Sequence, residues 1–105
     1  MTDVVLGIDI GTSGVRIAAT DDSNTLKAMS TAPIVAPITD FGRAWQDPQI
    51  WWNATLAAFT ALQLDRLHVR AISIDGTSGT ILAVNADGAP ASLGSMYNDV
   101  CDAAN

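Results

Sequence analysis

The chain has 105 residues, 49% of them hydrophobic, which is enough for the core of one small domain and argues against global disorder. Its formal net charge of −6 argues against a nucleic acid or an anionic membrane as the partner, because both bind basic surfaces. The sequence has one cysteine, Cys101, no apolar run long enough to cross a membrane and no signal-peptide pattern, which together predict a cytoplasmic protein without an internal disulfide.

The first third of the chain predicts three strands joined by short turns. Residues 4–10 form a nearly continuous apolar run with β-branched members, typical of a strand buried on both faces. Apolar and polar residues alternate over 15–20, which predicts a second strand. Residues 25–32 follow the turn at 21–24 as a third strand. Strands in this order, with turns this short, predict an antiparallel meander.

A helix is predicted after a loop at residues 33–42, which holds two prolines and a glycine. Asp47 is a suitable N-cap, and Pro48 then occupies the first helical position, where its missing N–H costs nothing. The helix is expected to end near Leu64. Four large apolar residues share one face and are expected to point to the core: Trp52, Leu56, Phe59 and Leu62.

Residues 69–75 predict a fourth strand, and the length of the crossover before it indicates that it lies parallel to an earlier strand. The fold class is therefore α/β, a mixed sheet with three antiparallel strands, a crossover helix and a parallel fourth strand. Short strands are expected at 80–85 and 90–97 around a turn, and a helix is expected from Asn98.

Two loops share one design. Residues 9–14 and residues 75–79 each begin with an aspartate at the end of an apolar strand, followed by glycines interleaved with hydroxyl residues. If the first and fourth strands are parallel neighbours, both loops leave the same edge of the sheet. In open α/β sheets, ligands bind at that carboxyl edge.

The chemistry of these loops is that of phosphate binding. Glycines allow the backbone to approach an anion closely, and Thr12 and Ser13 add hydroxyl donors. Asp9 supplies the oxygen ligand that Mg²⁺ prefers. The same residues also form ordinary turns. An aspartate that ends an apolar strand is less ordinary, because a buried charge is costly without a partner.

Four motifs in order resemble the FGGY carbohydrate kinase family of the actin-like ATPase superfamily. Residues 7–16 are similar to its first phosphate motif, and residues 45–52 resemble the Gln-Asp-Pro-x-x-Trp-Trp segment of xylulokinase-like members. Residues 73–80 are similar to the stretch that reaches the sugar, and residues 96–99 to the aromatic-Asn-Asp segment. The Asp-Gly-Thr-Ser form of the third motif is closest to the D-ribulose kinase branch and departs from the Gly-Gln-Met-His form of D-xylulose kinases.

The resemblance implies a ribonuclease H-like domain that uses ATP and Mg²⁺ to phosphorylate a small sugar such as D-ribulose or D-xylulose. Asp9 would act on the metal. The ATP phosphates would lie near Gly11, Thr12, Ser13 and Arg16, and the sugar near Asp75, Thr77, Ser78 and Asp99. The family's catalytic base and second domain come later in the chain. Residues 1–105 would therefore be the N-terminal part of the first kinase domain, without a catalytic residue and inactive alone.

Other interpretations remain beside the kinase. A non-catalytic module that binds a nucleotide or a sugar has the same loops, and so does a structural half-domain in which they are only turns. Arg16 is equally consistent with a solvated charge. Trp45, Trp51 and Trp52 are candidates for stacking on a sugar, with Trp45 preferred because it lies in the loop, whereas Trp52 is expected in the core. No catalytic role is expected for His68, nor a reactive one for Cys101.

Overall fold

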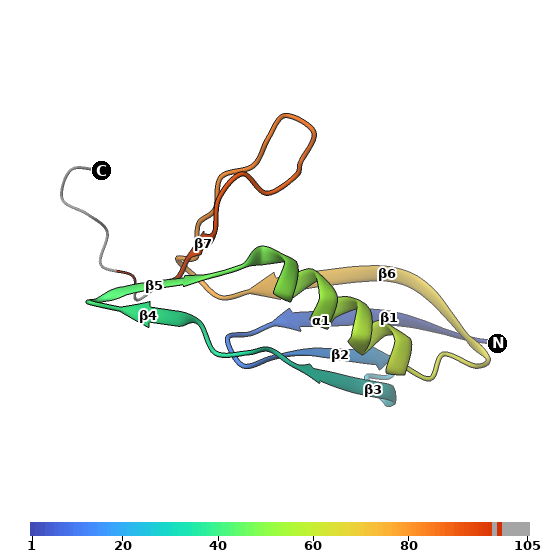
Figure 1. The fold of residues 1–105 in the computed structure, drawn as a ribbon. Helices are drawn as coiled ribbons and strands as arrows, with labels where there is room; N and C mark the ends of the chain where they lie inside the picture. The colour runs from blue at the N-terminus through green and yellow to red at the C-terminus, as the bar shows by residue number, and fades with distance from the viewer. Residues whose placement is uncertain (98, 100–105) are drawn as a thin grey trace.

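The computed structural model describes residues 1–97 and 99. A four-stranded sheet forms the body of the protein, and one helix lies across one of its faces (Figure 1). A second sheet of three short strands lies beyond one end of the first. The helix expected from residue 98 and the thiol at position 101 lie outside the described residues.

The main sheet confirms the predicted α/β architecture. Its strands are β1 (Thr2–Ile10), β2 (Gly14–Thr20), β3 (Leu26–Pro33) and β6 (Leu67–Gly76), in the order β3-β2-β1-β6. The first three pair antiparallel in a meander. β6 pairs parallel with β1, as the length of the crossover predicts.

The crossover helix α1 (Pro48–Ala61) begins as expected. The side chain of Asp47 accepts a hydrogen bond from the backbone N–H of Gln49 at 2.9 Å, and Pro48 follows the cap. The helix ends at Ala61 rather than near Leu64, because Leu62 is already extended and its N–H donates to the carbonyl of Phe59 at 3.1 Å. No helix in the described part of the chain is long and apolar enough to span a membrane.

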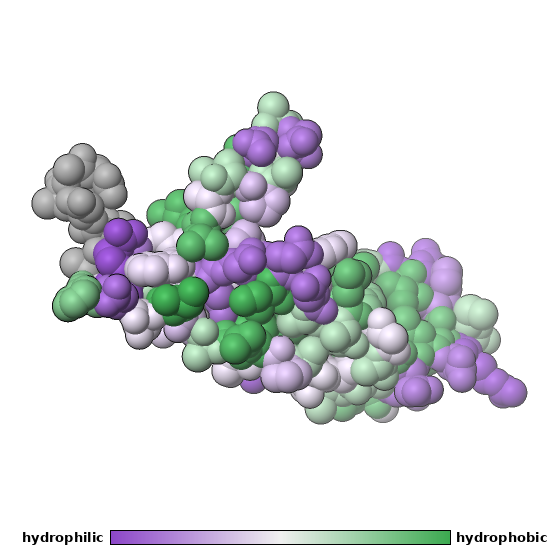
Figure 2. Space-filling view, viewed as in Figure 1, coloured by the Kyte–Doolittle hydropathy of each residue, from purple (hydrophilic) through white to green (hydrophobic). Residues whose placement is uncertain are grey.

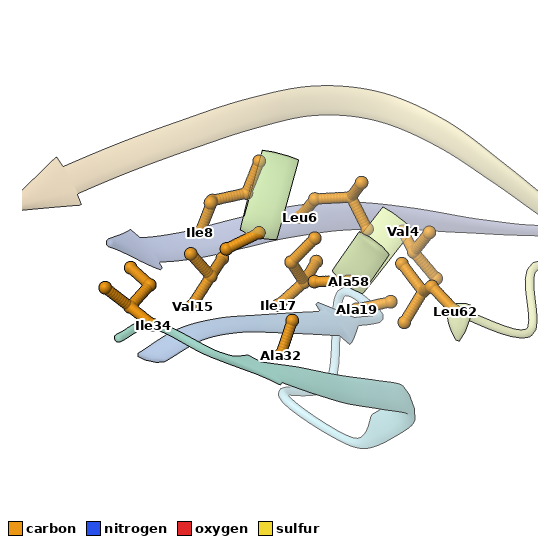
Figure 3. Close-up of a cluster of buried hydrophobic side chains, with 11 residues drawn as sticks. Val4, Leu6, Ile8, Val15, Ile17, Ala19, Ala32, Ile34, Ala58 and Leu62 are labelled. Carbon is orange, nitrogen blue, oxygen red and sulfur yellow. The ribbon is translucent and has the colours of Figure 1, made fainter. Parts of the chain in front are cut away.

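The core lies between α1 and the sheet face that it covers. Figure 3 shows side chains from β1, β2 and β3 gathered beneath the helix: Val4, Leu6, Ile8, Val15, Ile17, Ala32 and others. Small residues bring the helix close, since Ala54 and Ala58 are buried. The hydroxyl of buried Ser30 donates to the carbonyl of Ala58 at 2.6 Å, which ties β3 to the helix.

Two predictions of burial are wrong. Trp52 and Leu56 do not reach the core but are 58% and 45% exposed, because the helix turns its small residues toward the sheet. Figure 2 shows hydrophobic residues reaching the surface over α1, among polar ones. The strand β1 is buried on one face only: Val5 is 46% exposed while its neighbours Val4 and Leu6 are buried, since no described element covers the face opposite the helix.

The second sheet corrects the expected loop at 33–42. It contains β4 (Ile38–Asp40), β5 (Arg43–Gln46) and β7 (Gly94–Ser95) in the order β4-β5-β7. The hairpin between β4 and β5 turns at Phe41 and Gly42, which both have positive φ, as a type I′ turn requires. The strands expected at 80–85 and 90–97 reduce to β7 and two isolated bridges, Ile81 with Ser95 and Val84 with Pro90.

Candidate functional site

The two matching loops leave the same edge of the main sheet. In the parallel pairing of β1 with β6, Asp9 lies opposite Asp75 and Ile10 lies opposite Gly76. The first loop (residues 9–14) and the second loop (residues 75–79) therefore start side by side at the carboxyl ends of two parallel strands. This is the position at which open α/β sheets bind ligands.

Three charged side chains meet at this edge. Arg16 lies opposite Asp9 in the pairing of β1 with β2, and its guanidinium donates to the Asp9 carboxylate. This hydrogen bond, with a further one from Asp75, lowers the pKa of Asp9. The same contact with Asp9, and then its negative charge, raises the pKa of Asp75. Asp9 is thus the carboxyl that stays ionised, and Asp75 is the one that more readily holds a proton.

A cavity of about 330 Å³ lies beside the first loop, and we call it the Arg16 cavity. It is lined by residues 11–16 and residues 31–33. All four residues expected near phosphate contribute to it: Gly11, Thr12, Ser13 and Arg16. The structure therefore brings these four residues together around one hollow.

The first loop is tied down at both ends. The N–H of Gly11 donates to the carbonyl of Gly14, and the carbonyl of Ser13 accepts from Ile34, both at 2.9 Å. The backbone N–H groups of Thr12 and Ser13 donate to no described residue. Two such amides in a fixed turn, beside a guanidinium, form a site suited to an anion.

A second cavity of about 330 Å³ lies under the second loop, and we call it the Trp51 cavity. Its walls are mostly apolar, with a few polar groups, as in small-molecule sites. The lining residues are Ile10, Gly11, Gln46, Trp51, Ile74, Asp75, Gly76, Thr77, Thr80, Leu82 and Met96. The hydroxyls of Thr77 and Thr80 are 2.6 Å apart. Gly11 lines both cavities, so the first loop borders both hollows.

One residue of the Trp51 cavity to which sequence reasoning gave no role is Gln46. Gln46 is only 2% exposed; its Oε1 accepts from the indole N–H of Trp51 at 2.6 Å, and its Nε2 donates to the carbonyl of Val35 at 2.7 Å. These contacts fix the amide in one orientation and hold the indole against the cavity. Both residues belong to the Gln-Asp-Pro-x-x-Trp motif, from which the sequence analysis takes the family resemblance and the start of the helix but no role for Gln46.

Several expected site residues lie elsewhere. Ser78 is exposed and lines neither cavity. Asp99 also lies outside both and is held by Arg43, Ala44 and Ser95. The ring of Trp45 lies under the guanidinium of Arg43, 5.7 Å from the ring centroid. The tryptophan at the cavity is therefore Trp51 and not Trp45.

Two further observations bear on chemistry. His68 lies at the other end of the sheet, where its Nδ1 is 3.1 Å from the Asp3 carboxylate. Within residues 1–97 and 99, no three histidine, cysteine or acidic side chains gather as a ready-made metal site. Asp9 and Asp75 lie opposite each other at the carboxyl edge. Two carboxylates suit a cation that takes its remaining ligands from water or from a bound substrate.

Residues 4–98 match the model of the N-terminal domain of the FGGY family of carbohydrate kinases. The chain is 31% identical over 109 residues to xylulose kinase of Staphylococcus epidermidis, covering 92% of this chain and 20% of the relative. It is 34% identical over 73 residues to xylulose kinase of Escherichia coli K12, covering 68% and 15%. The chain thus spans about a fifth or less of the length of these relatives.

Solved structures share the fold. Xylulose kinase from Rhodospirillum rubrum superposes with a TM-score of 0.82 at 22% identity, covering 91% of this chain and 21% of that one. Plasmodium falciparum glycerol kinase, solved with ADP, gives a TM-score of 0.79 at 15% identity, covering 94% and 21%. At these identities the likeness establishes the actin-like ATPase fold that the sequence predicts.

Proposed function

Because this chain belongs to the FGGY family of carbohydrate kinases, we propose that it acts within an enzyme that transfers the γ-phosphate of ATP to a hydroxyl of a ketopentose. In this proposal, residues 1–105 are the N-terminal part of the first kinase domain. The observation that carries it is the register of β1 and β6, which places Asp9 opposite Asp75 at the edge from which both cavity-lining loops start.

The two cavities suit the two halves of a phosphoryl transfer. The donor phosphate and the accepting hydroxyl must approach one point from opposite sides, so catalysis depends on positioning and on neutralising charge. In our proposal the Arg16 cavity holds the phosphate end of ATP, with the amides of Thr12 and Ser13 as donors. The Trp51 cavity holds the sugar. Gly11, which lines both, lies where the two ligands meet.

The residues at the edge fit a magnesium ion. Mg²⁺ is usually held by one or two carboxylates together with water and substrate phosphates, rather than by a full protein cage. Asp9 and Asp75 supply that number of carboxylates, and Asp9, with its lowered pKa, is ionised at neutral pH. We assign Asp9 to the metal. Bound there, the ion would neutralise negative charge on the transferred phosphate.

The Trp51 cavity fits a small polyhydroxylated ligand. The apolar walls suit the C–H faces of a sugar, and Asp75, Thr77 and Thr80 offer polar atoms to its hydroxyls. D-Ribulose is our preferred substrate, because the second loop reads Asp-Gly-Thr-Ser. D-Xylulose is the alternative that the names of the curated relatives suggest. Ser78 and Asp99 complete the proposed set around the sugar. Neither lines the cavity, so in this proposal Ser78 contacts the part of the sugar that extends beyond it.

The test is turnover by the full-length protein. ADP release is measured with ATP and Mg²⁺ against D-ribulose, D-xylulose, glycerol and gluconate, with a sugar-free reaction as the control. The expected result is sugar-dependent ADP release, fastest with D-ribulose. Turnover that favours D-xylulose would overturn the ribulose assignment only. Binding of ATP or sugar without turnover on any substrate would establish the non-catalytic module instead.

A further inference from the structure

Asp99 is the most completely engaged carboxylate in the described part of the chain. Its side chain is only 1% exposed. Oδ1 accepts from Arg43 Nε at 2.8 Å and from the Ala44 backbone N–H at 2.7 Å. Oδ2 accepts from Arg43 Nη2 at 3.2 Å and from the Ser95 hydroxyl at 2.5 Å. A carboxylate has about four acceptor positions, so these four bonds leave little capacity for a ligand.

The donors come from two segments that are distant in the sequence. Arg43 and Ala44 belong to β5, and Ser95 belongs to β7. The two strands pair over only two residue pairs, Trp45 with Ser95 and Gln46 with Gly94, and one further backbone bond joins Met96 to Ala44 at 3.0 Å. A ladder this short has little stability by itself. Asp99 joins the two strands beyond the last residue pair, because it accepts hydrogen bonds from Arg43 and Ala44 of β5 and from Ser95 of β7.

The same two segments build one wall of the Trp51 cavity. β5 carries Gln46, and Met96 follows β7. Between them, Gly94 lies against Trp51, and a Cβ at position 94 would come within 2.8 Å of indole Cζ2. The ring, the amide and the methionine are therefore fitted to each other closely, and a small shift of β7 against β5 changes the shape of the cavity.

We propose that Asp99 is a positioning residue of the Trp51 cavity: it locks β7 to β5 and so fixes Gln46, Trp51 and Met96, without touching the sugar. This inference rests on the proposed function, in which that cavity holds the sugar. It replaces direct sugar contact, the role that the aromatic-Asn-Asp motif suggests.

The charge of Asp99 is part of this role. The side-on Arg43 pair is a charge-assisted, two-bond contact, which is stronger and more directional than a neutral hydrogen bond. An asparagine at this position keeps one acceptor oxygen but turns an NH₂ group toward two donors. The Ser95 hydroxyl can rotate to accept from it, whereas the Arg43 N–H cannot. Asp99→Asn is therefore expected to loosen the strand pair without removing side-chain volume.

The experiment compares Asp99→Asn with Ser95→Ala in the full-length protein, by steady-state kinetics with the preferred sugar and with ATP. Ser95 lines neither functional cavity, and its hydroxyl, the group that the substitution removes, donates to Asp99. We expect Asp99→Asn to raise the sugar KM about tenfold, the size of one lost charge-assisted bond. We expect Ser95→Ala to raise it by a smaller factor. kcat and the ATP KM should stay near wild type in both.

Three further variants sharpen the test. Ser95→Thr keeps the hydroxyl and is expected to keep the wild-type sugar KM. The Asp99→Asn, Ser95→Ala double variant should be less impaired than the product of the two single effects, because both break one contact. Asp87→Asn, at an exposed turn where its carboxylate accepts only from Ala89 among described residues, is the matched control and should change nothing. An unchanged sugar KM in Ser95→Ala, beside a large rise in Asp99→Asn, would overturn positioning in favour of direct contact.

Hydrogen exchange separates this inference from the proposed function. If the wild type turns over no sugar, the kinase proposal fails, yet the lock is still measurable in the full-length protein. Asp99→Asn and Ser95→Ala should both speed amide exchange in residues 43–46 and 94–97 while residues 2–10 stay protected. Exchange at wild-type rates in both segments would overturn the lock whatever the enzyme does.

Discussion

The two loops at the carboxyl edge are nearly alike in sequence and are held by different forces. The first loop (residues 9–14) is fixed by its backbone, through the Gly11–Gly14 bond and the bond from Ile34 to Ser13. The second loop (residues 75–79) has no such ties among the described residues. It is shaped by the hydroxyl contact of Thr77 with Thr80 and by Gly79, which has a φ of 78°.

The glycines show the same difference. A Cβ at position 14 would lie 3.0 Å from the carbonyl oxygen of Ala32, so Gly14 is required by the close approach of β3. Gly79 is required first by its positive φ, which only glycine adopts without strain, and a Cβ there would also lie 3.3 Å from the Cβ of Tyr97. Similar amino-acid sequences thus form one rigid loop, which is suited to an anion, and one open loop, which is suited to a neutral ligand.

The first prediction concerns the aspartate of the rigid loop. We expect Asp9→Asn in the full-length protein to lower kcat by on the order of 10²-fold, the size typical of losing one electrostatic stabiliser of the transition state. The sugar KM should stay near wild type, because Asp9 does not line the Trp51 cavity. Steady-state kinetics at saturating Mg²⁺ measure both quantities.

Asp22→Asn is the control for this substitution, because it makes the same change of charge far from the edge. Asp22 lies in the exposed turn between β2 and β3. A wild-type kcat in Asp9→Asn would remove Asp9 from the metal. A large rise in sugar KM would instead place it at the sugar, and the two loops would then share one role.

The second prediction tests the glycines directly. Gly14→Ala should destabilise the fold by about 1–3 kcal/mol, as overpacking does, since both the new Cβ and the Ala32 carbonyl belong to rigid backbone. Gly79→Ala should cost about 1–2 kcal/mol through strain at positive φ, and Gly79→Asn less. Gly76→Ala, whose Cβ would meet Ile10 at an ordinary 3.7 Å, is the control. Urea denaturation measures all four, and a loss in Gly79→Asn as large as that in Gly79→Ala would abolish the distinction.

Local patterns in the sequence account for most of the main sheet and for half of the site. Alternation predicts β2, the Asp47-Pro48 pair predicts the start of α1, and the crossover length predicts that β6 runs parallel to β1. Once that pairing is given, the loops must share an edge, which is why the sequence indicates that residues 9–14 and 75–79 start side by side.

The remainder depends on contacts that leave no local pattern. β5 and β7 pair across a long stretch of sequence and are too short to show periodicity. The sequence does not predict the turn before β5, because phenylalanine rarely adopts the positive φ that Phe41 has in this turn. Trp52 was misplaced because hydrophobic size was counted, whereas α1 packs through Ala54 and Ala58. Gln46 was missed because a buried amide at a cavity is indistinguishable in sequence from an exposed one.

The third prediction concerns the open loop. Ser78→Ala is expected to weaken apparent sugar affinity by about 1–3 kcal/mol and to leave the ATP KM unchanged, because a site that hydrogen-bonds its ligand is left with unpaired groups. Ser78 is exposed in this chain, so this role requires the sugar or the rest of the enzyme to cover it. Ser78→Thr, which keeps the hydroxyl, is the matched variant. Sugar KM at wild-type level in Ser78→Ala would assign the contact to Thr77 instead.

The smallest expected effect separates the two aspartates that begin the loops. The pKa of Asp75 is raised by its hydrogen bond to Asp9 and by the charge of Asp9. A raised carboxyl pKa contributes stability that is present at low pH and is lost as the pH rises through the folded-state pKa. The pKa of Asp9 is lowered, chiefly by Arg16, so its stabilising contribution has the opposite pH dependence. It is present at neutral pH and is lost as the pH falls through the folded-state pKa.

Asp75→Asn keeps a hydrogen-bond donor toward Asp9 and removes the second charge. The variant should therefore gain thermal stability relative to wild type as the pH rises from about 4 to 7, across and above the usual range of an aspartate. The gain should be small, because both carboxyls are open to solvent, and it should shrink at high salt, which screens like charges. Melting temperatures across this pH range, in low and high salt, measure the difference, with Asp87→Asn as the control. A variant that instead loses stability steadily above pH 5 would mean that Asp75 is held ionised by Arg16, and the two loops would then carry equivalent carboxylates.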